Sequence, residues 1–229
     1  MGPQASIKRL NPQVRAGRVG VEAQSNGPKT RIQREKREVI LQAALDVFST
    51  QGFRGSTIDQ IAEAAGMSKP NLLYYYRSKE EIHRTLLHRL LHRWLAPLEE
   101  ISAEGDPVKE LRGYIRRKIE MARDYPRESR LFANEILQDA PRILEMLTGE
   151  LKPLVDGKAK VLSQWMREGK LAKVDPYHLI FAVWATTQHY ADFDVQVRAV
   201  LGPDRGGEGR FEDAARFIEQ LFLEGLRPR

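Results

Sequence analysis

Directly after Ser68, a short helical pattern presents four polar side chains, those of Lys69, Asn71, Tyr74 and Tyr75. Ammonium, amide and phenol groups near the start of a helix can form hydrogen bonds with base edges and phosphates in the major groove of DNA. This segment is therefore a candidate surface for reading DNA. The alternative is a pair of short helices whose polar face is only solvated.

Two short helices would position these side chains. Apolar residues recur at helical spacing over residues 58–65, and the hydroxyl of Thr57 can cap the first turn. Gly66 suits the left-handed backbone that ends such a helix, and Ser68 can cap a second helix that has Pro70 in its first turn. Helices joined by so short a turn must cross steeply, so the pattern predicts a helix-turn-helix.

The second short helix also needs an inward face, which we expect Leu72, Leu73 and Tyr76 to form. Ser78 can then cap a long helix whose first residue, Lys79, can meet the DNA backbone. The full set of residues predicted to contact DNA is Thr57, Ser68, Lys69, Asn71, Tyr74, Tyr75 and Lys79.

A second group of chemically capable residues comprises Trp94, Trp184 and Gln188. On a strongly apolar helical pattern, Trp184 and Gln188 share one face with Tyr177 and Phe181. A carboxamide presents a donor and an acceptor in one plane, the complement of the adjacent N–H and carbonyl groups of a pyrimidine ring. The two indoles could form flat apolar walls. From spacing alone, the simpler interpretation is that both tryptophans are core and that the amide bonds a neighbouring backbone group.

The same apolar helix has a neighbouring face with smaller side chains. Ala182, Thr186 and His189 lie on it. Together with the last helix of the chain, this face could pack against a second copy and form a four-helix dimer interface. We therefore expect a homodimer built through the last two predicted helices.

His88 and His92 lie four residues apart on one helical face and could share a metal ion. His83 lies off that face, and no carboxylate follows at the spacing of a zinc protease motif. A solvated histidine face is the preferred interpretation, so the sequence predicts neither a metal site nor a cofactor. The segment GPDRGGEG is interpreted as a flexible connector, because it lacks the Gly-Lys-Ser/Thr ending of a phosphate loop.

The periodicity predicts an all-α protein with nine helices and three parts. Residues 1–30 carry five Lys or Arg against one Glu and no regular period, which indicates a disordered basic arm that either reaches along DNA or is only solvated. Residues 31–77 would form a three-helix DNA-binding domain, and residues 78–229 a six-helix domain for ligand binding and dimerisation. The helices outside the helix-turn-helix are expected at residues 34–51, 78–100, 107–123, 126–137, 141–168 (irregular around Gly149 and Pro153), 175–192 and 211–226.

The run from Arg37 to Leu86, which contains AALDVFSTQGFRGSTIDQIAEAAGMSK, resembles the N-terminal domain of TetR-family transcriptional regulators. SKPNLLYYYRSK departs from the common family pattern and is similar to the variant found in the subgroup of pyrimidine-utilisation repressors. WLAPL, RDYP and TQHYADF resemble that subgroup in the rest of the chain. The resemblance implies a homodimeric repressor of double-stranded operator DNA, with uracil or thymine as the effector bound by Trp94, Trp184 and Gln188.

Composition limits the remaining function classes. The chain has 229 residues, a net charge of +6 and a pI of about 9.5, a balance that favours polyanionic partners. Cysteine is absent, which excludes disulfides and thiolate chemistry.

Because no apolar run approaches membrane length and no signal peptide is evident, we expect a cytoplasmic protein without membrane contact. No constellation of a nucleophile, a base or a metal indicates an enzyme. A nucleic-acid binder without sequence preference, or a repressor with another planar effector, stays open.

Overall fold

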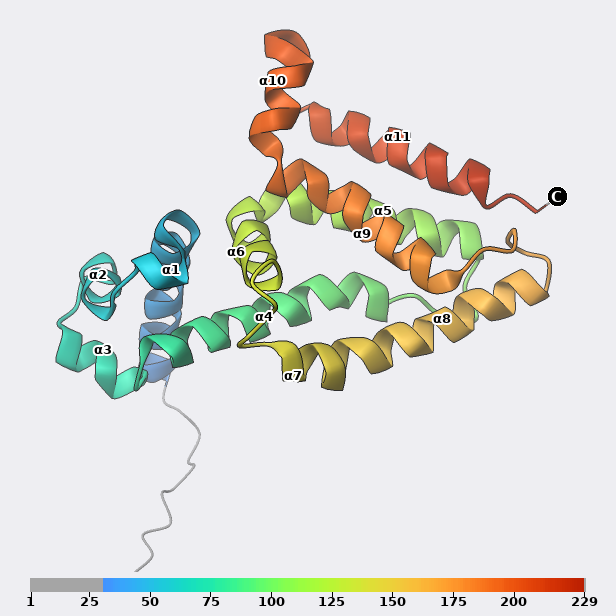
Figure 1. Cartoon of the computed structure of the whole chain (residues 1–229). Helices are drawn as coiled ribbons and strands as arrows, with labels where there is room; N and C mark the ends of the chain where they lie inside the picture. The colour runs from blue at the N-terminus through green and yellow to red at the C-terminus, as the bar shows by residue number, and fades with distance from the viewer. Residues whose placement is uncertain (1–30, 229) are drawn as a thin grey trace, which may run out of the picture.

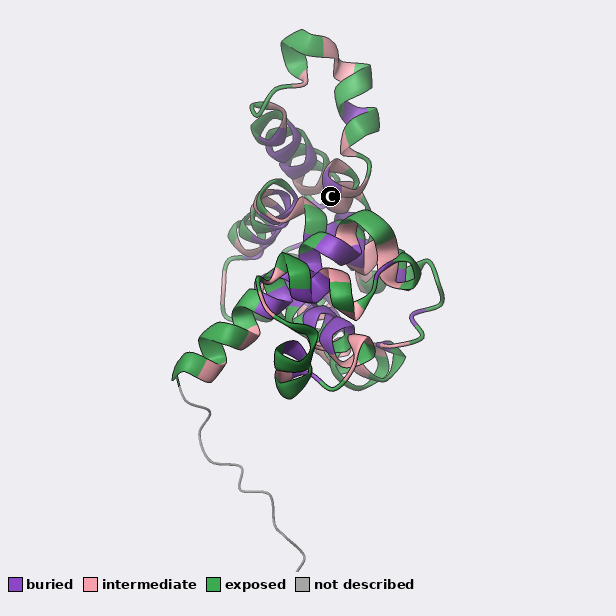
Figure 2. Cartoon of the chain, turned by 90° about the vertical axis from the view of Figure 1, so that its left-hand side faces the viewer, coloured by how far each residue is buried: buried purple, intermediate pink, exposed green. Residues whose placement is uncertain are grey.

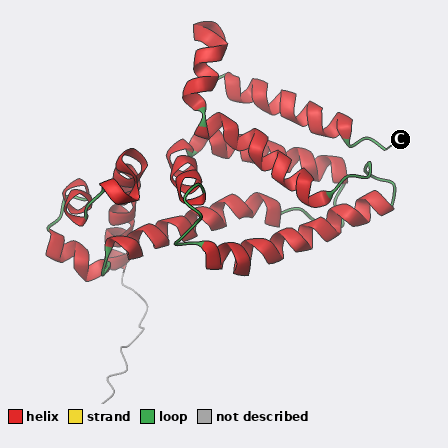
Figure 3. Ribbon diagram, viewed as in Figure 1, coloured by secondary structure: helices red, strands yellow, loops and turns green. Residues whose placement is uncertain are grey.

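The computed structural model describes residues 31–228, and every regular element among them is a helix (Figure 3). This confirms the all-α prediction. The predicted basic arm, residues 1–30, lies outside the described residues. None of the described helices combines the length and the apolar character that crossing a bilayer would need.

Three helices form the head of the molecule: α1 (Arg31–Gly55), α2 (Ile58–Ala64) and α3 (Lys69–Tyr75). The Thr57 hydroxyl accepts a hydrogen bond from the Gln60 amide, and the Gln60 side chain accepts one from the amide of Thr57, which completes a capping box. Ser68 caps α3 through the amide of Asn71, and Gly66 has a φ of +64°. The predicted caps and turn are thus confirmed.

One predicted anchor of α3 is wrong. Leu72 and Tyr76 are fully buried, but Leu73 is 36% exposed. A seven-residue helix makes only about two turns, so it presents a single narrow stripe to the core. Leu72 occupies that stripe, and Leu73 lies about 100° further round the helix.

The long helix α4 (Lys79–Glu99) runs from the head into the body (Figure 1). Ser78 caps its first turn. The body adds α5 (Pro107–Asp124), α6 (Pro126–Ile136), α7 (Leu144–Met146), η1 (Leu147–Leu151), α8 (Lys152–Arg167), α9 (Pro176–Asp192), α10 (Asp194–Arg205) and α11 (Arg210–Gly225). The irregularity expected around Gly149 is a π-helical turn, η1, between α7 and α8.

Helix α10 is absent from the sequence prediction, which assigned its last residues to a flexible connector. In the structure the helical segment continues to Arg205, with a break at Gly202, whose φ is +72°. Pro203 has no amide hydrogen to donate, and proline is well tolerated in the first turn of a helix, where that hydrogen would have no partner. The helix therefore resumes at Pro203 after this break. Only residues 206–209 connect α10 with α11.

Two clusters of buried hydrophobic residues hold the molecule together, and the buried residues lie on helix faces turned toward one another (Figure 2). One cluster belongs to the body and includes the fully buried Trp165. The other joins the head to neighbouring body helices, since Phe48 of α1 shares it with Trp94 of α4, Leu131 of α6 and Ile143. The head therefore packs on the body through a continuous apolar core.

Candidate functional site

The polar side chains predicted to read DNA lie together at the tip of the head. Ser68, Lys69, Asn71 and Tyr74 are exposed on α3 or at its cap. Tyr75 is half-buried, and its ring meets that of Tyr74 edge to face at a centroid distance of 5.1 Å. The arrangement presents an amide and two phenol groups from one helix, next to the exposed Thr57 cap of α2.

Two lysines of the predicted set already have partners. The Nζ of Lys69 lies 2.9 Å from Oδ2 of Asp59 in an exposed ion pair between α3 and α2. The Nζ of Lys79 donates to the carbonyls of Phe53 and Ser56, at 2.8 and 2.7 Å. Lys79 therefore ties the end of α1 to the start of α4, and its contact with DNA stays a prediction.

A cavity of about 640 Å³ lies in the body between α4, α5, α6 and α9, and Trp94, Trp184 and Gln188 all line it. Helices far apart in the sequence thus bring the three predicted residues to one place. Gln188 makes no hydrogen bond to any other residue in the described part of the chain, so its amide is available to a ligand. Trp94 is buried, and Trp184 is partly buried against the body core.

The Trp184 indole is held in place by α5. Its Nε1 donates a hydrogen bond to the hydroxyl of Tyr114, 2.5 Å away. Tyr114 is itself buried, and burial raises the pKa of its hydroxyl well above the usual value. A protonated phenol at this position keeps the indole plane fixed against the cavity wall.

Sequence reasoning missed a buried lysine that lines the same cavity. Lys118 is 3% exposed, and its Nζ lies 5.8 Å from the centre of the Trp94 ring. Burial lowers the pKa of Lys118 to about 7, and the negative charge of Asp192 opposes that shift. A sequence signal exists, because Lys118 shares the inward stripe of α5 with Ile115 and Ile119.

Asp192 is the acidic residue of this cavity, at the end of α9. Its Oδ1 accepts a hydrogen bond of 2.6 Å from the hydroxyl of Ser129 on α6. Burial raises the pKa of the Asp192 carboxyl, against the lowering effect of the Ser129 hydrogen bond and nearby cations. The cavity therefore combines two indoles with an amide, an ammonium and a carboxyl group.

Two other residues expected on the inward face of α9 do not line the cavity. Phe181 is 47% exposed, and the hydroxyl of Tyr177 donates to Asp156 of α8 at the surface. They share a stripe with Trp184 and Gln188, but the cavity lies over the C-terminal half of α9 only. The stripe that was expected to face inward is thus exposed at Phe181. On the neighbouring face expected at a dimer interface, Ala182 and Thr186 are half-buried and His189 is exposed.

The cavity reaches the head through α6. Ser49 of α1 lines it together with residues of α6, and α6 packs along α1. Just after α6, Arg142 forms a 2.9 Å ion pair with the buried Glu135. The Arg142 guanidinium carbon lies 3.6 Å from the ring centre of Phe53, at the end of α1. The cavity wall and the segment after α6 are thus both in direct contact with α1.

Two family models match this chain. The model described as bacterial regulatory proteins, tetR family, matches residues 40–85, and the model described as YcdC-like protein, C-terminal region, matches residues 87–229. The HTH-type transcriptional regulator RutR of Escherichia coli (strain K12) is 46% identical over 205 residues, which cover 90% of this chain and 97% of that regulator.

Solved structures of regulators have the same fold. The TetR family transcriptional regulator PfmR from Thermus thermophilus has a TM-score of 0.64 at 22% identity, covering 81% of this chain and 97% of that one. A bacterial regulatory protein of the tetR family from Rhodococcus RHA1 has a TM-score of 0.68 at 16% identity, covering 85% and 98%. At these identities the likeness concerns the fold alone.

Proposed function

Because this chain belongs to the TetR family of transcriptional regulators, we propose that it is a homodimeric repressor that a pyrimidine such as uracil or thymine releases from double-stranded operator DNA. Membership of this family identifies a DNA-binding regulator and not an enzyme. Since operator DNA lies in the cytoplasm of bacteria, we also propose a cytoplasmic location.

The convergence of Trp94, Trp184 and Gln188 on one cavity carries the proposal. A planar heterocycle can lie against the indoles, a contact worth about 1–3 kcal/mol by analogy with bases on aromatic side chains. The unpaired Gln188 carboxamide can accept from a ring N–H and donate to the adjacent carbonyl. The resemblance of SKPNLLYYYRSK, WLAPL and TQHYADF to the subgroup of pyrimidine-utilisation repressors supports a pyrimidine effector over other planar compounds.

Lys118 completes the recognition of a ring with two carbonyl groups. Its ammonium has no hydrogen bond within the described residues, so a ligand carbonyl can become its partner. A hydrogen bond from a charged donor contributes about 1.5–3 kcal/mol. Gln188 and Lys118 would then form hydrogen bonds with two different edges of the ring, while the hydrogen bond to Tyr114 holds the indole of Trp184 in place.

Release from DNA would follow from the position of the cavity. A ligand that contacts Trp94 touches α4, and one that contacts the α6 wall acts on the helix that packs against α1. In a dimer, the two reading helices must lie about 34 Å apart to enter successive major grooves. A ligand that favours another separation weakens operator binding, with a coupling free energy of typically about 1–3 kcal/mol.

The dimer itself would form through α9 and α11. Phe181 of α9 and Phe217 and Leu221 of α11 are exposed hydrophobic residues on two neighbouring helices. Exposed apolar surface of this kind marks an interaction site. A second copy related by a two-fold axis would cover it with the same helices and complete a four-helix interface.

Calorimetric titration with uracil tests the ligand assignment. Native protein should bind one uracil per chain, and Gln188→Leu should lose about 1–3 kcal/mol of binding free energy, because an amide partner of the ring is removed. Gln164→Leu, on the exposed surface of α8, is the matched control. Uracil binding that is equally strong in Gln188→Leu would exclude the amide as the recognition group. Titrations with thymine and with purines would separate a pyrimidine effector from a larger planar one.

A further inference from the structure

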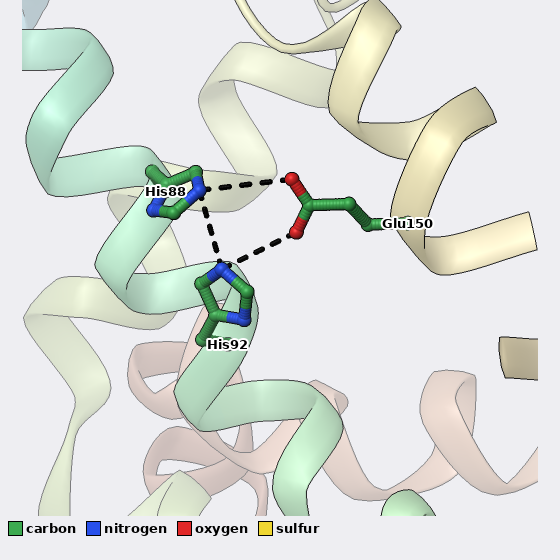
Figure 4. Close-up of side chains that lie close together, drawn as sticks. All are labelled: His88, His92 and Glu150. Carbon is green, nitrogen blue, oxygen red and sulfur yellow. Dashed lines mark hydrogen bonds and ion pairs between the residues drawn. The ribbon is translucent and has the colours of Figure 1, made fainter.

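Two histidines of α4 and one glutamate of η1 meet outside the proposed DNA and ligand sites. His88 and His92 project from adjacent turns of α4, and Glu150 points toward both of them from the opposite segment (Figure 4). The two Nε2 atoms lie 3.2 Å apart. Glu150 places one carboxylate oxygen 3.6 Å from Nε2 of His88 and the other 3.2 Å from Nε2 of His92.

The Nε2–Nε2 separation of 3.2 Å is close to that between two ligand atoms of a tetrahedral metal ion, and one ligand atom from each of the three residues lies within 4.8 Å of the others. Zinc binds imidazole nitrogen and carboxylate oxygen at about 2.0–2.2 Å. At the tetrahedral angle, two such ligand atoms lie about 3.3–3.6 Å apart, because the edge of a tetrahedron is about 1.63 times the bond length. A single ion could therefore reach all three groups with only small side-chain adjustments.

The chemistry of the set also suits a metal of this class. Two imidazoles and a carboxylate are the protein ligands of many zinc sites that keep a fourth position for water. The side chains of His88, His92 and Glu150 are 48%, 51% and 40% exposed, so an ion can enter from solvent. Among residues 31–228, the three make hydrogen bonds or ion pairs only with one another.

The backbone that carries Glu150 is unusual in a way that supports a site. Residues Leu147–Leu151 form a π-helical turn, the only one in the described chain, between the short helix α7 and α8. Single π-helical turns occur frequently at functional sites, where the wider turn redirects a side chain. The sequence could not indicate this glutamate, which lies 58 residues beyond His92 and at no motif spacing.

We propose that His88, His92 and Glu150 bind a divalent ion of the zinc class, with a water molecule as the fourth ligand. The ion ties η1 to the middle of α4, the helix that joins the head to the pyrimidine cavity. It holds α4 in the arrangement seen in this structure. Leu147 and Leu151 of the same turn line the pyrimidine cavity, so the ion also fixes part of the cavity wall. The metal site rests on its own three residues, and metal binding alone tests it.

Titration of the full-length, tag-free protein with Co²⁺ tests the proposal, since a histidine tag would itself bind the ion. We expect one Co²⁺ per chain, with the intense visible absorption of a tetrahedral ion. His92→Ala and Glu150→Gln should each weaken binding by about a hundredfold, at least as much as loss of an outer-shell partner costs a metal site. His178→Ala removes a histidine of α9 that is remote from this cluster and should bind as the native protein does.

Thermal unfolding with Zn²⁺ gives a second measurement that does not depend on the spectrum. An ion that binds the folded state should raise the melting temperature of the native protein and of His178→Ala, but not of the two cluster variants. Because the mutated side chains are exposed, the variants should keep the circular dichroism of the native fold. Absence of a one-to-one complex, or binding that survives both cluster substitutions, would overturn the proposal.

Discussion

The guanidinium of Arg142 stacks on the ring of Phe53, 3.6 Å from its centre, while it pairs with the buried carboxylate of Glu135. One side chain thereby joins the segment after α6 to the end of α1. Glu135 also accepts a hydrogen bond of 2.8 Å from the backbone amide of Arg142. The junction between head and body is therefore fixed by a buried ion pair with an aromatic cover.

Replacement of Arg142 by alanine should destabilise the protein strongly. The Glu135 side chain is 2% exposed, and removal of one partner leaves an uncompensated buried charge, which costs about 3–5 kcal/mol. Urea unfolding measures this free energy. The matched control is Arg127→Ala, because Arg127 of α6 also pairs with α1, through Asp46, but at the surface. That variant should lose less than about 1 kcal/mol. Similar losses in both variants would contradict a special role for the buried pair.

His83 should make the stability depend on pH. Burial lowers its pKa to about 4, and its Nδ1 has no hydrogen-bond partner. Between pH 4 and the ordinary histidine pKa of 6.5, the unfolded chain binds more protons, so stability falls as the pH falls, by up to about 3 kcal/mol. Urea unfolding of the native protein and of His83→Phe at several pH values should give curves that diverge over this range. If the unfolding free energies of the two proteins change in parallel with pH, His83 is not the cause of the pH dependence.

Lys118 should make pyrimidine binding depend on pH. Burial lowers its pKa to about 7, and a ligand carbonyl would favour the ammonium form. Affinity should therefore be constant below about pH 7 and fall by up to about tenfold per pH unit above it. Calorimetry with native protein and Lys118→Met tests this, and the variant should bind more weakly without that slope. A slope that persists in Lys118→Met would assign the titration to another group.

The reading helix should account for operator affinity. Asn71→Ala and Tyr75→Ala should each cost about 1–3 kcal/mol if their side chains contact bases. Gel-shift titrations can compare these variants with Gln51→Ala, which changes an exposed polar residue of α1. Unchanged operator affinity in both variants would show that a surface other than α3 contacts the bases. Affinity that follows salt concentration alone, with no preference among DNA sequences, would favour the non-specific binder.

A charge on the exposed faces of α9 and α11 should separate the dimer. Phe217 is an exposed aromatic residue of α11, and Phe217→Glu would leave an unpaired charge inside the proposed interface. Sedimentation at micromolar concentration should show monomers for this variant and dimers for the native protein. Val39→Glu, on the exposed surface of α1, should remain dimeric. A native protein that is monomeric under these conditions would exclude a dimer whose two reading helices enter successive major grooves.

Local chemistry explains which parts of the fold the sequence could predict. Thr57, Ser68 and Gly66 each act within a few residues of their own position, as two capping hydroxyls and a turn glycine. Their roles could therefore be predicted from the local sequence. Helix α10 was missed because the glycines and proline of residues 202–209 have the composition of a loop. In the structure, Gly202 has a positive φ and forms the break between residues 194–201 and the short helical end at residues 203–205.

The cavity was predictable only in part. The indoles and Gln188 could be identified by residue type and by resemblance to a known subgroup. The role of Lys118 could not, because it depends on how α5 packs against α4 and α9. The meeting of His88 and His92 with Glu150 likewise depends on tertiary structure, since 58 residues separate the glutamate from His92 in the chain.

The apolar core that unites Phe48 with Trp94 and Leu131 has a consequence for engineering. A chimera made by grafting residues 31–77 onto the body of another regulator would lose the contacts that α1 makes with α4 and α6. A stable hybrid should therefore require that α4 and α6 be grafted together with the head. The unit to transfer between regulators would then be the head together with α4 and α6, and the specificities for DNA and for effector could not be exchanged by joining two chains at Ser78.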